Sequence, residues 1–418
     1  MLNDINIENF IDEKNPLKAT IVSEKGSFAC RRAIGEGYYD SEKNRTYIAW
    51  NEKGMDIYLA YYDYAEKKWS TPELVWKCDL FGRWEYHDYI TLIQGTNGEP
   101  LFIYHIHSNS SYMIKKDAVG TWQHTQISDD ENAYPAPIVY KNTIYYFYSK
   151  NKEITYPYRP LRFMKSTDNG DTWSEPRDVV DSGKKTPDKV EEVYQSSVIF
   201  APANKKFPDR FIISYTMWGG QKHAWCGKGA FCILFYPHNE KCYTPDGELI
   251  GDVVDFEKMS KSPRAYEGRI SPFDEYRHST YPPVPQYDGE GNPVLVYGVR
   301  DEKEKGLYYA VFKDGAWQTM CISNEMWNIK DAQRVGNRLD LVLPHGDKVV
   351  VLSKHDDEEE FKIQSVTKIP HANKSDSVPY LNFISGEKAE NKLLIGTIHV
   401  DDIPGYCEGK WPVAVLGE

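Results

Sequence analysis

A chain of 418 residues, of which 40% are hydrophobic, is long enough to fold as several domains or as one large repetitive domain. Its formal net charge of −12 argues against a nucleic-acid partner, because neutralising phosphate groups takes clustered Lys and Arg. A mean hydropathy of −0.62 and the lack of a long apolar run argue against a membrane span.

The start of the chain shows no sign of a secretion signal. Residues 1–18 contain no basic stretch followed by an apolar stretch. The compartment therefore stays open between the cytoplasm and secretion with a signal removed.

Short β-rich segments recur along the chain at a spacing of about 45–60 residues. Three to four strands at such a period are typical of propeller blades. We therefore expect an all-β fold, a seven-bladed β-propeller that forms a single domain over residues 1–418. A pair of β-sandwiches is the alternative, but it does not explain a period that runs the whole length. The repeated segments are residues 45–51, 99–107, 143–150, 209–218, 292–300, 347–354 and 391–399.

Two histidines and two further polar residues occupy matching positions in neighbouring repeats. His87 precedes an inner strand and His107, 20 residues later, ends the next strand, so an antiparallel pair brings both to one face. Tyr134 and Lys150 hold the same two positions in the following repeat. The sequence therefore predicts that these four side chains converge near the propeller axis. Histidines that only pack or form hydrogen bonds are the alternative.

The segment STDNGDTW at residues 166–173 predicts a tight turn between two strands. Gly170 tolerates a positive φ, and the Asp168 carboxylate can accept hydrogen bonds from turn amides. We interpret the segment as an Asp-box, a structural hairpin on the rim, with degenerate copies at residues 66–72 and 314–317. The chemistry is then expected elsewhere, where loops meet at the axis.

Three of the seven cysteines lie close together in the sequence and follow a histidine. Three thiols and an imidazole fit a closed tetrahedral zinc site, which would pin a long insertion. Buried free thiols are the alternative. The candidate zinc ligands are His223, Cys226, Cys232 and Cys242.

Elimination at a uronate sugar needs a base for the C5 proton, a donor that stabilises the carboxylate, and an acid for the leaving oxygen. His, Tyr and Lys can fill these roles near neutral pH. Hydrolysis would instead need a pair of carboxylates, and Glu85 and Asp88 are the acids nearest to His87 in sequence.

The order of His87, His107, a Tyr-Pro pair at Tyr134, a basic residue and then the 166–173 turn resembles the BNR-repeat (Asp-box) β-propeller polysaccharide lyases. This family includes ulvan lyases and rhamnosyl-glucuronate lyases, and its motifs are identifiable over about residues 80–300. The resemblance implies cleavage between rhamnose and a uronic acid. It also implies that the two histidines and the tyrosine are catalytic, and that some members bind structural zinc.

The sequence departs from this family at Lys150, where the family has an arginine. Arg159 or Arg162 from the adjacent stretch can take its place. The change matters because Arg binds a carboxylate with two parallel hydrogen bonds, whereas Lys is a point charge. Tyr194 and His278 are further candidates for contacting the substrate.

Three functions remain open from the sequence. The first is a lyase acting on an acidic, ulvan-like polysaccharide, without a cofactor for the chemistry and as a monomer. The second is a glycoside hydrolase of the rhamnosidase or sialidase kind on the same scaffold. The third is a propeller that binds glycans through its aromatic residues without catalysis.

Overall fold

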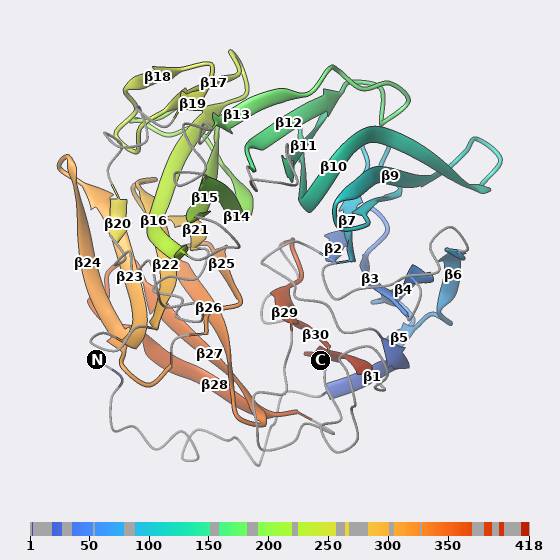
Figure 1. Cartoon of the computed structure of the whole chain (residues 1–418). Coiled ribbons are helices and arrows are strands. Elements are labelled where there is room, and N and C mark those ends of the chain that lie inside the picture. Colours follow the sequence, from blue (N-terminus) through green and yellow to red (C-terminus); the bar gives the residue numbers. More distant parts are fainter. Residues whose placement is uncertain are drawn as a thin grey trace.

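The computed structural model describes residues 2, 19–26, 36–52, 55–78, 88–150, 159–181, 191–219, 225–255, 264–266, 283–300, 305–326, 328–369, 380–386, 393–396 and 411–417. Within these ranges the long regular elements are all β-strands, which form six sheets. Figure 1 shows the sheets arranged in chain order around a common centre, which is a β-propeller arrangement. The part of the chain so described contains no helix that is long and apolar enough to cross a membrane.

Three sheets are built from strands that lie between residues 37 and 266. The first holds β2 (Gly37–Asp40), β3 (Arg45–Asn51), β4 (Ile57–Asp63), β5 (Lys68–Trp69) and β6 (Glu73–Trp76). The second holds β7 (Tyr89–Gln94), β8 (Pro100–His105), β9 (Asn109–Lys116), β10 (Trp122–Tyr140), β11 (Thr143–Lys150), β12 (Leu161–Ser166), β13 (Arg177–Asp181) and β19 (Val254–Asp255). The third holds β14 (Glu191–Ala201), β15 (Arg210–Gly219), β16 (Trp225–Tyr236), β17 (Lys241–Tyr243), β18 (Leu249–Gly251) and β20 (Arg264–Tyr266).

The other three sheets each have four strands. One holds β21 (Val284–Tyr287), β22 (Pro293–Arg300), β23 (Lys305–Lys313) and β24 (Ala316–Ser323). The next holds β25 (Asp331–Val335), β26 (Arg338–His345), β27 (Lys348–His355) and β28 (Lys362–Lys368). The last pairs both ends of the chain, in the order β1 (Ala19–Gly26), β31 (Trp411–Leu416), β30 (Leu393–Gly396) and β29 (Tyr380–Phe383).

The expected count of seven blades does not appear as seven separate sheets among the described strands. The reason is β10, which runs unbroken for 19 residues. Its first part pairs with β9 and its second part with β11, so what the repeats predict as two units is one eight-stranded sheet.

A set of strands that we call the inner strands contact one another in chain order around the centre. The hydrogen bond from the Tyr39 N–H to the Ser385 carbonyl, at 2.8 Å, joins the last of these strands to the first. The inner strands are β2, β7, the second part of β10, β14, β21, β25 and β29.

Hydrophobic side chains pack between neighbouring sheets rather than within one central core. In β11, Tyr145 and Phe147 face the next sheet, whereas Ile144, Tyr146 and Tyr148 pack against β8 and β9 in the first part of their own eight-stranded sheet. Because successive side chains of a strand point to opposite faces, a strand that is buried on both faces is apolar throughout. This explains the continuous apolar and aromatic run TIYYFYSK.

The segment 166–173 forms the predicted turn after β12. Asp168 accepts hydrogen bonds from the Thr172 N–H at 2.9 Å and from the Thr172 hydroxyl at 2.6 Å, and Ser166 donates to it at 2.7 Å. Gly170 has a φ of +86°. The turn is therefore held by its own side chains, whereas its membership of a repeated Asp-box series stays an interpretation.

Candidate functional site

The candidate site lies where β7, the second part of β10, and β14 begin. Within the described chain, six of the residues that the sequence singled out for catalysis or substrate binding can be placed. His87 and His278 lie outside the described residues. The six are His107, Tyr134, Lys150, Arg159, Arg162 and Tyr194.

His107 stands in a turn that is fixed to two inner strands. Its main-chain N–H donates to the Asp88 carboxylate at 2.7 Å, and Asp88, directly before β7, is only 1% exposed. The next residue, Ser108, has a φ of +57° and donates its N–H to the Asn132 carbonyl of β10 at 3.0 Å. The half-buried imidazole therefore starts from a backbone held between β7 and β10.

Tyr134 sits in an irregular part of β10. The register against β11 shifts between Ala133 and Ala136, and Tyr134 between them has a φ of +60°. A positive φ is rare for a bulky residue, and a bulge of this kind re-aims the side chain. The ring lies 5.5 Å from the ring of Tyr194 in β14, so the two tyrosines meet across neighbouring inner strands.

Arg159 joins these two tyrosines. Its guanidinium lies 5.4 Å from the Tyr134 ring and 4.8 Å from the Tyr194 ring, and its Nε lies 3.7 Å from Glu192. Burial favours a lower pKa for Arg159, but the neighbouring Tyr194, Tyr134 and Glu192 raise the pKa overall. Since Arg159 is 4% exposed, it holds the tyrosines in place rather than presenting its charge to solvent.

Lys150 and Arg162 come together on a carboxylate that the sequence did not single out. Asp130 of β10 contacts the Lys150 ammonium and accepts hydrogen bonds from Arg162 at 2.8 Å and from the Tyr148 hydroxyl at 2.7 Å. Burial favours a higher pKa for Asp130, but Lys150, Tyr148 and Arg162 lower the pKa overall. Asp130 therefore stays charged and anchors both cations at this end of β10 and β11.

The sequence interpretation assigned no structural role to three acids at this site, namely Asp88, Asp130 and Glu192. Asp130 precedes Tyr134 in β10 and Glu192 precedes Tyr194 in β14 by a few residues, whereas Asp88 directly follows His87 in the sequence. All three are at least nine-tenths buried. In β10 and β14, an acid placed shortly before a tyrosine was the available signal.

The predicted zinc ligands do not assemble as expected. Cys232 packs in one hydrophobic cluster and Cys242 in another, on opposite faces of the same sheet. Phe235, three residues after Cys232 in β16, is the residue that pairs with Cys242, which explains the opposite faces. One ion cannot contact both thiols, so the prediction that Cys232 and Cys242 bind the same zinc ion is wrong.

Other observations on the metal prediction agree with this geometry. Burial raises the pKa of the Cys232 thiol far above its ordinary value, so Cys232 is a neutral buried thiol in this structure. His223 and the side chain of Cys226 lie outside the described residues. Among the residues that are described, no group of three or more His, Cys, Asp or Glu side chains is placed to hold a metal ion.

No protein-family model matches the sequence, and no curated protein matches it either. Solved structures are similar in fold. An ulvan lyase of polysaccharide lyase family PL25, bound to a GlcA(1-4)Rha3S saccharide, superposes with a TM-score of 0.74 at 14% identity over 96% of each chain. The polysaccharide lyase Uly1 gives a TM-score of 0.64 at 11% identity over 96% of this chain and 99% of its own. At these identities the likeness establishes the β-propeller fold.

Proposed function

We propose that this chain is a polysaccharide lyase that cleaves a rhamnose–uronate glycan of the ulvan kind by β-elimination. The observation that carries the proposal is that the His107 turn is hydrogen-bonded to Asn132 of β10, two residues before Tyr134, whose ring lies beside Arg159. The fold shared with an ulvan lyase over nearly the whole of both chains supports it.

The proposed chemistry divides three tasks among the described residues. His107 and Tyr134 form the pair that removes the C5 proton and protonates the leaving oxygen. Lys150 faces the uronate carboxylate, because 24% of its side chain is exposed, compared with 18% for Arg162 and 5% for Arg159. Arg159 acts as a positioning residue for Tyr134.

The use of lysine sets an expectation for substrate selection. A lysine ammonium attracts a carboxylate as a point charge, whereas arginine also fixes its orientation through two hydrogen bonds. Asp130 restricts the Lys150 ammonium from one side, so its orientation is partly set by the protein. We therefore propose a weaker orientation of the uronate than an arginine would impose.

Hydrolysis is less compatible with the same geometry. A glycosidase needs two carboxyl groups that reach the scissile bond. Asp88 accepts a hydrogen bond from the His107 N–H, Glu192 lies beside the Arg159 guanidinium, and Asp130 is occupied by two cations and a tyrosine hydroxyl. These three acids are committed to holding the site together.

The finer architecture is also a proposal. We propose a single-domain, monomeric propeller of seven blades over residues 1–418. The division of β10 into a part that pairs with β9 and a part that pairs with β11 supports two blades within the eight-stranded sheet. The consecutive contacts of the inner strands support the same count. A closed ring of sheets leaves no long edge that needs a partner.

The test follows ultraviolet absorbance during incubation with ulvan, because elimination creates a conjugated unsaturated uronate. We expect a rise for the wild type, and a rate at least about 100-fold lower for His107→Ala and for Tyr134→Phe, since each removes a proton-transfer group. His238→Ala, which alters an exposed histidine after β16, is the control and keeps the wild-type rate.

Two outcomes would contradict the proposal. New reducing ends without a rise in absorbance would identify a hydrolase. Saturable binding of ulvan without either product would identify a glycan-binding propeller.

A further inference from the structure

A cavity lies at the other end of the inner strands from His107. Asp88 and Asn132, which hold the His107 turn, stand near the beginnings of β7 and the second part of β10, whereas the cavity is lined by the ends of both. Its volume is about 710 Å³, within the range of pockets that take small organic ligands. The polar and aromatic side chains that line it include Tyr38, Tyr39, Glu42, Gln94, Asn97 and Lys141.

One wall of this cavity is the loop at residues 95–98, which the turn at residues 166–173 holds in place. The Asn169 side chain of that turn accepts hydrogen bonds from the Thr96 N–H at 2.8 Å and from the Thr96 hydroxyl at 3.2 Å. Gly95 permits this approach, because a Cβ on Gly95 would lie 2.7 Å from the Asn169 side-chain oxygen. The 95–98 loop is therefore fixed against a neighbouring part of the sheet.

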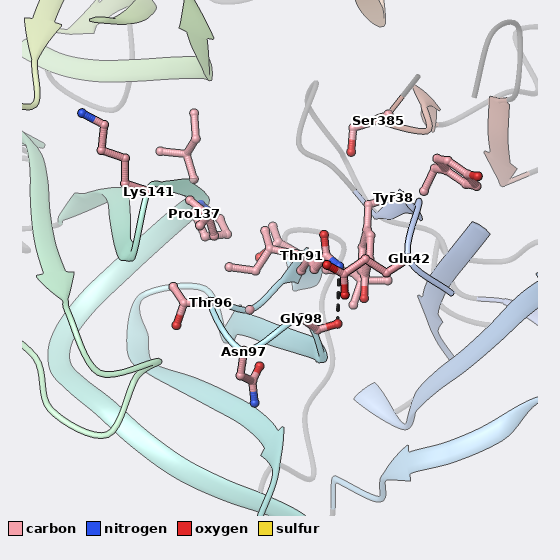
Figure 2. Close-up of a pocket in the computed structure, with 17 residues that line it drawn as sticks. Tyr38, Glu42, Thr91, Thr96, Asn97, Gly98, Pro137, Lys141 and Ser385 are labelled. Atoms are coloured by element: carbon pink, nitrogen blue, oxygen red, sulfur yellow. Dashed lines mark hydrogen bonds between the residues drawn. The ribbon is translucent and has the colours of Figure 1, made fainter. Parts of the chain in front are cut away.

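The opposite wall is the junction between the first and last inner strands. Tyr38 and Tyr39 of β2 line it together with Ser385, whose main chain is hydrogen-bonded to Gly37 and Tyr39. Figure 2 shows Tyr38, Glu42 and Ser385 on one side of the cavity, Pro137 and Lys141 on the other, and Thr96 and Asn97 along the wall between. The cavity therefore has polar groups on several sides.

The charges and hydrogen-bonding groups of the lining favour an uncharged ligand. The lining contains one acidic side chain, Glu42, and one basic side chain, Lys141. Their charges balance, so the cavity carries no net charge that would attract an ion. The Tyr38 hydroxyl is buried and, within the described residues, has no hydrogen-bond partner. A hydrogen bond from a ligand hydroxyl to the Tyr38 hydroxyl would offset the free energy lost when this group was buried without a partner. The flat face of a tyrosine ring also packs well against the apolar face of a sugar ring.

We propose that this cavity binds an uncharged sugar unit, at a site separate from the His107 cluster. Glu42 and Asn97 hydrogen-bond the sugar hydroxyls, and Asn169 positions the loop that carries Asn97. This inference does not depend on the lyase proposal, because it concerns binding at the other end of the propeller.

Calorimetric titration with L-rhamnose, a neutral sugar, tests the site directly. We expect saturable binding that is weakened about tenfold in Glu42→Gln and in Asn97→Ala, the loss caused by one hydrogen bond to a strongly polar or charged group. The control is Glu66→Gln, which alters an exposed glutamate in the turn after β4 and should bind as the wild type does. Turnover of ulvan, if present, should be unchanged in all three variants.

Three outcomes would overturn the inference. The first is no saturable binding of L-rhamnose by the wild type. The second is binding that is lost in Tyr134→Phe but kept in Glu42→Gln, which would place the sugar at the His107 cluster. The third is D-glucuronate binding more tightly than L-rhamnose and depending on Lys141, which would make the cavity an anion site.

Discussion

Tyr134 shows how a single residue at the candidate site is held in a costly conformation. A non-glycine residue at a φ of +60° costs on the order of 1–3 kcal/mol, so the surrounding structure must offset it. Tyr194 and Arg159 do so by packing against the ring from β14 and from the segment before β12. β14 carries a register shift of its own between Gln195 and Val198, next to Tyr194. Both inner strands are thus irregular beside these two tyrosines.

Asp331, at the start of β25, gives a prediction about pH. Burial raises its pKa to about 7, although it accepts hydrogen bonds from the Phe383 and Ala332 N–H groups. Because the unfolded chain titrates this group near 3.8, the folded protein holds an extra proton between these values. The contribution of Asp331 to stability is therefore full below the unfolded pKa and is lost as the pH rises through about 7.

We expect the Asp331→Asn variant to flatten the pH dependence of the free energy of unfolding. Urea unfolding of the wild type and the variant at about pH 5 and about pH 8 measures this. The free energy of unfolding of the wild type should fall more between the two pH values than that of the variant, because only the wild type carries Asp331. A difference between the two proteins that is the same at both pH values would show that Asp331 ionises in the folded protein as it does in the unfolded chain.

At the scale of one element, the 166–173 turn should contribute stability and not catalysis. The Thr172 hydroxyl and N–H and the Ser166 hydroxyl lower the pKa of Asp168 to about 2. Asp168→Ala removes the acceptor of these hydrogen bonds, so we expect a melting temperature lower by a few degrees and an unchanged catalytic rate. Thermal unfolding and the ulvan assay measure the two quantities.

The neighbouring Asp171→Ala is the control for this prediction. Asp171 is an exposed partner of Lys115, and an exposed ion pair contributes little to stability. Its melting temperature should stay near that of the wild type. Loss of turnover in a folded Asp168→Ala protein would show that the turn acts in catalysis.

At the scale of the whole molecule, the propeller depends on joining the first inner strand to the last. Gly386, beside this junction, has a φ of +122°, and a Cβ there would lie 2.8 Å from the Tyr39 Cβ. A non-glycine residue at a positive φ costs about 1–3 kcal/mol. Gly386→Ala should lower the free energy of unfolding by more than this, because the new Cβ also clashes with Tyr39. Denaturant unfolding measures the loss.

Gly120→Ala supplies the comparison for this prediction. Gly120 also has a positive φ, +84°, but a Cβ there would meet nothing within 4 Å. The difference between the two variants isolates the contact at the junction. Equal losses would mean that the junction relaxes around the added methyl group.

The sequence predicted part of the candidate site and could not predict the rest. The pairing of His107 with the region of Tyr134 was predictable from equivalent positions in neighbouring repeats, because repeated units place equivalent residues at one face. The partners Asp130 and Asp88 were not predicted, since their roles depend on which cations and amides the fold brings to them. Lys150 was expected to contact the substrate, and the structure ties it to Asp130.

The sequence by itself determined the all-β class, the repeated strands and the turn at residues 166–173, because strand propensity, alternation and turn chemistry are local properties. Only the tertiary structure decided that β10 joins two repeats into one sheet, since a bend or break at that point depends on both neighbouring strands. It also separated Cys232 from Cys242, because strand register sets the face on which each side chain lies. The cavity between the first and last inner strands likewise exists only once the ring has closed.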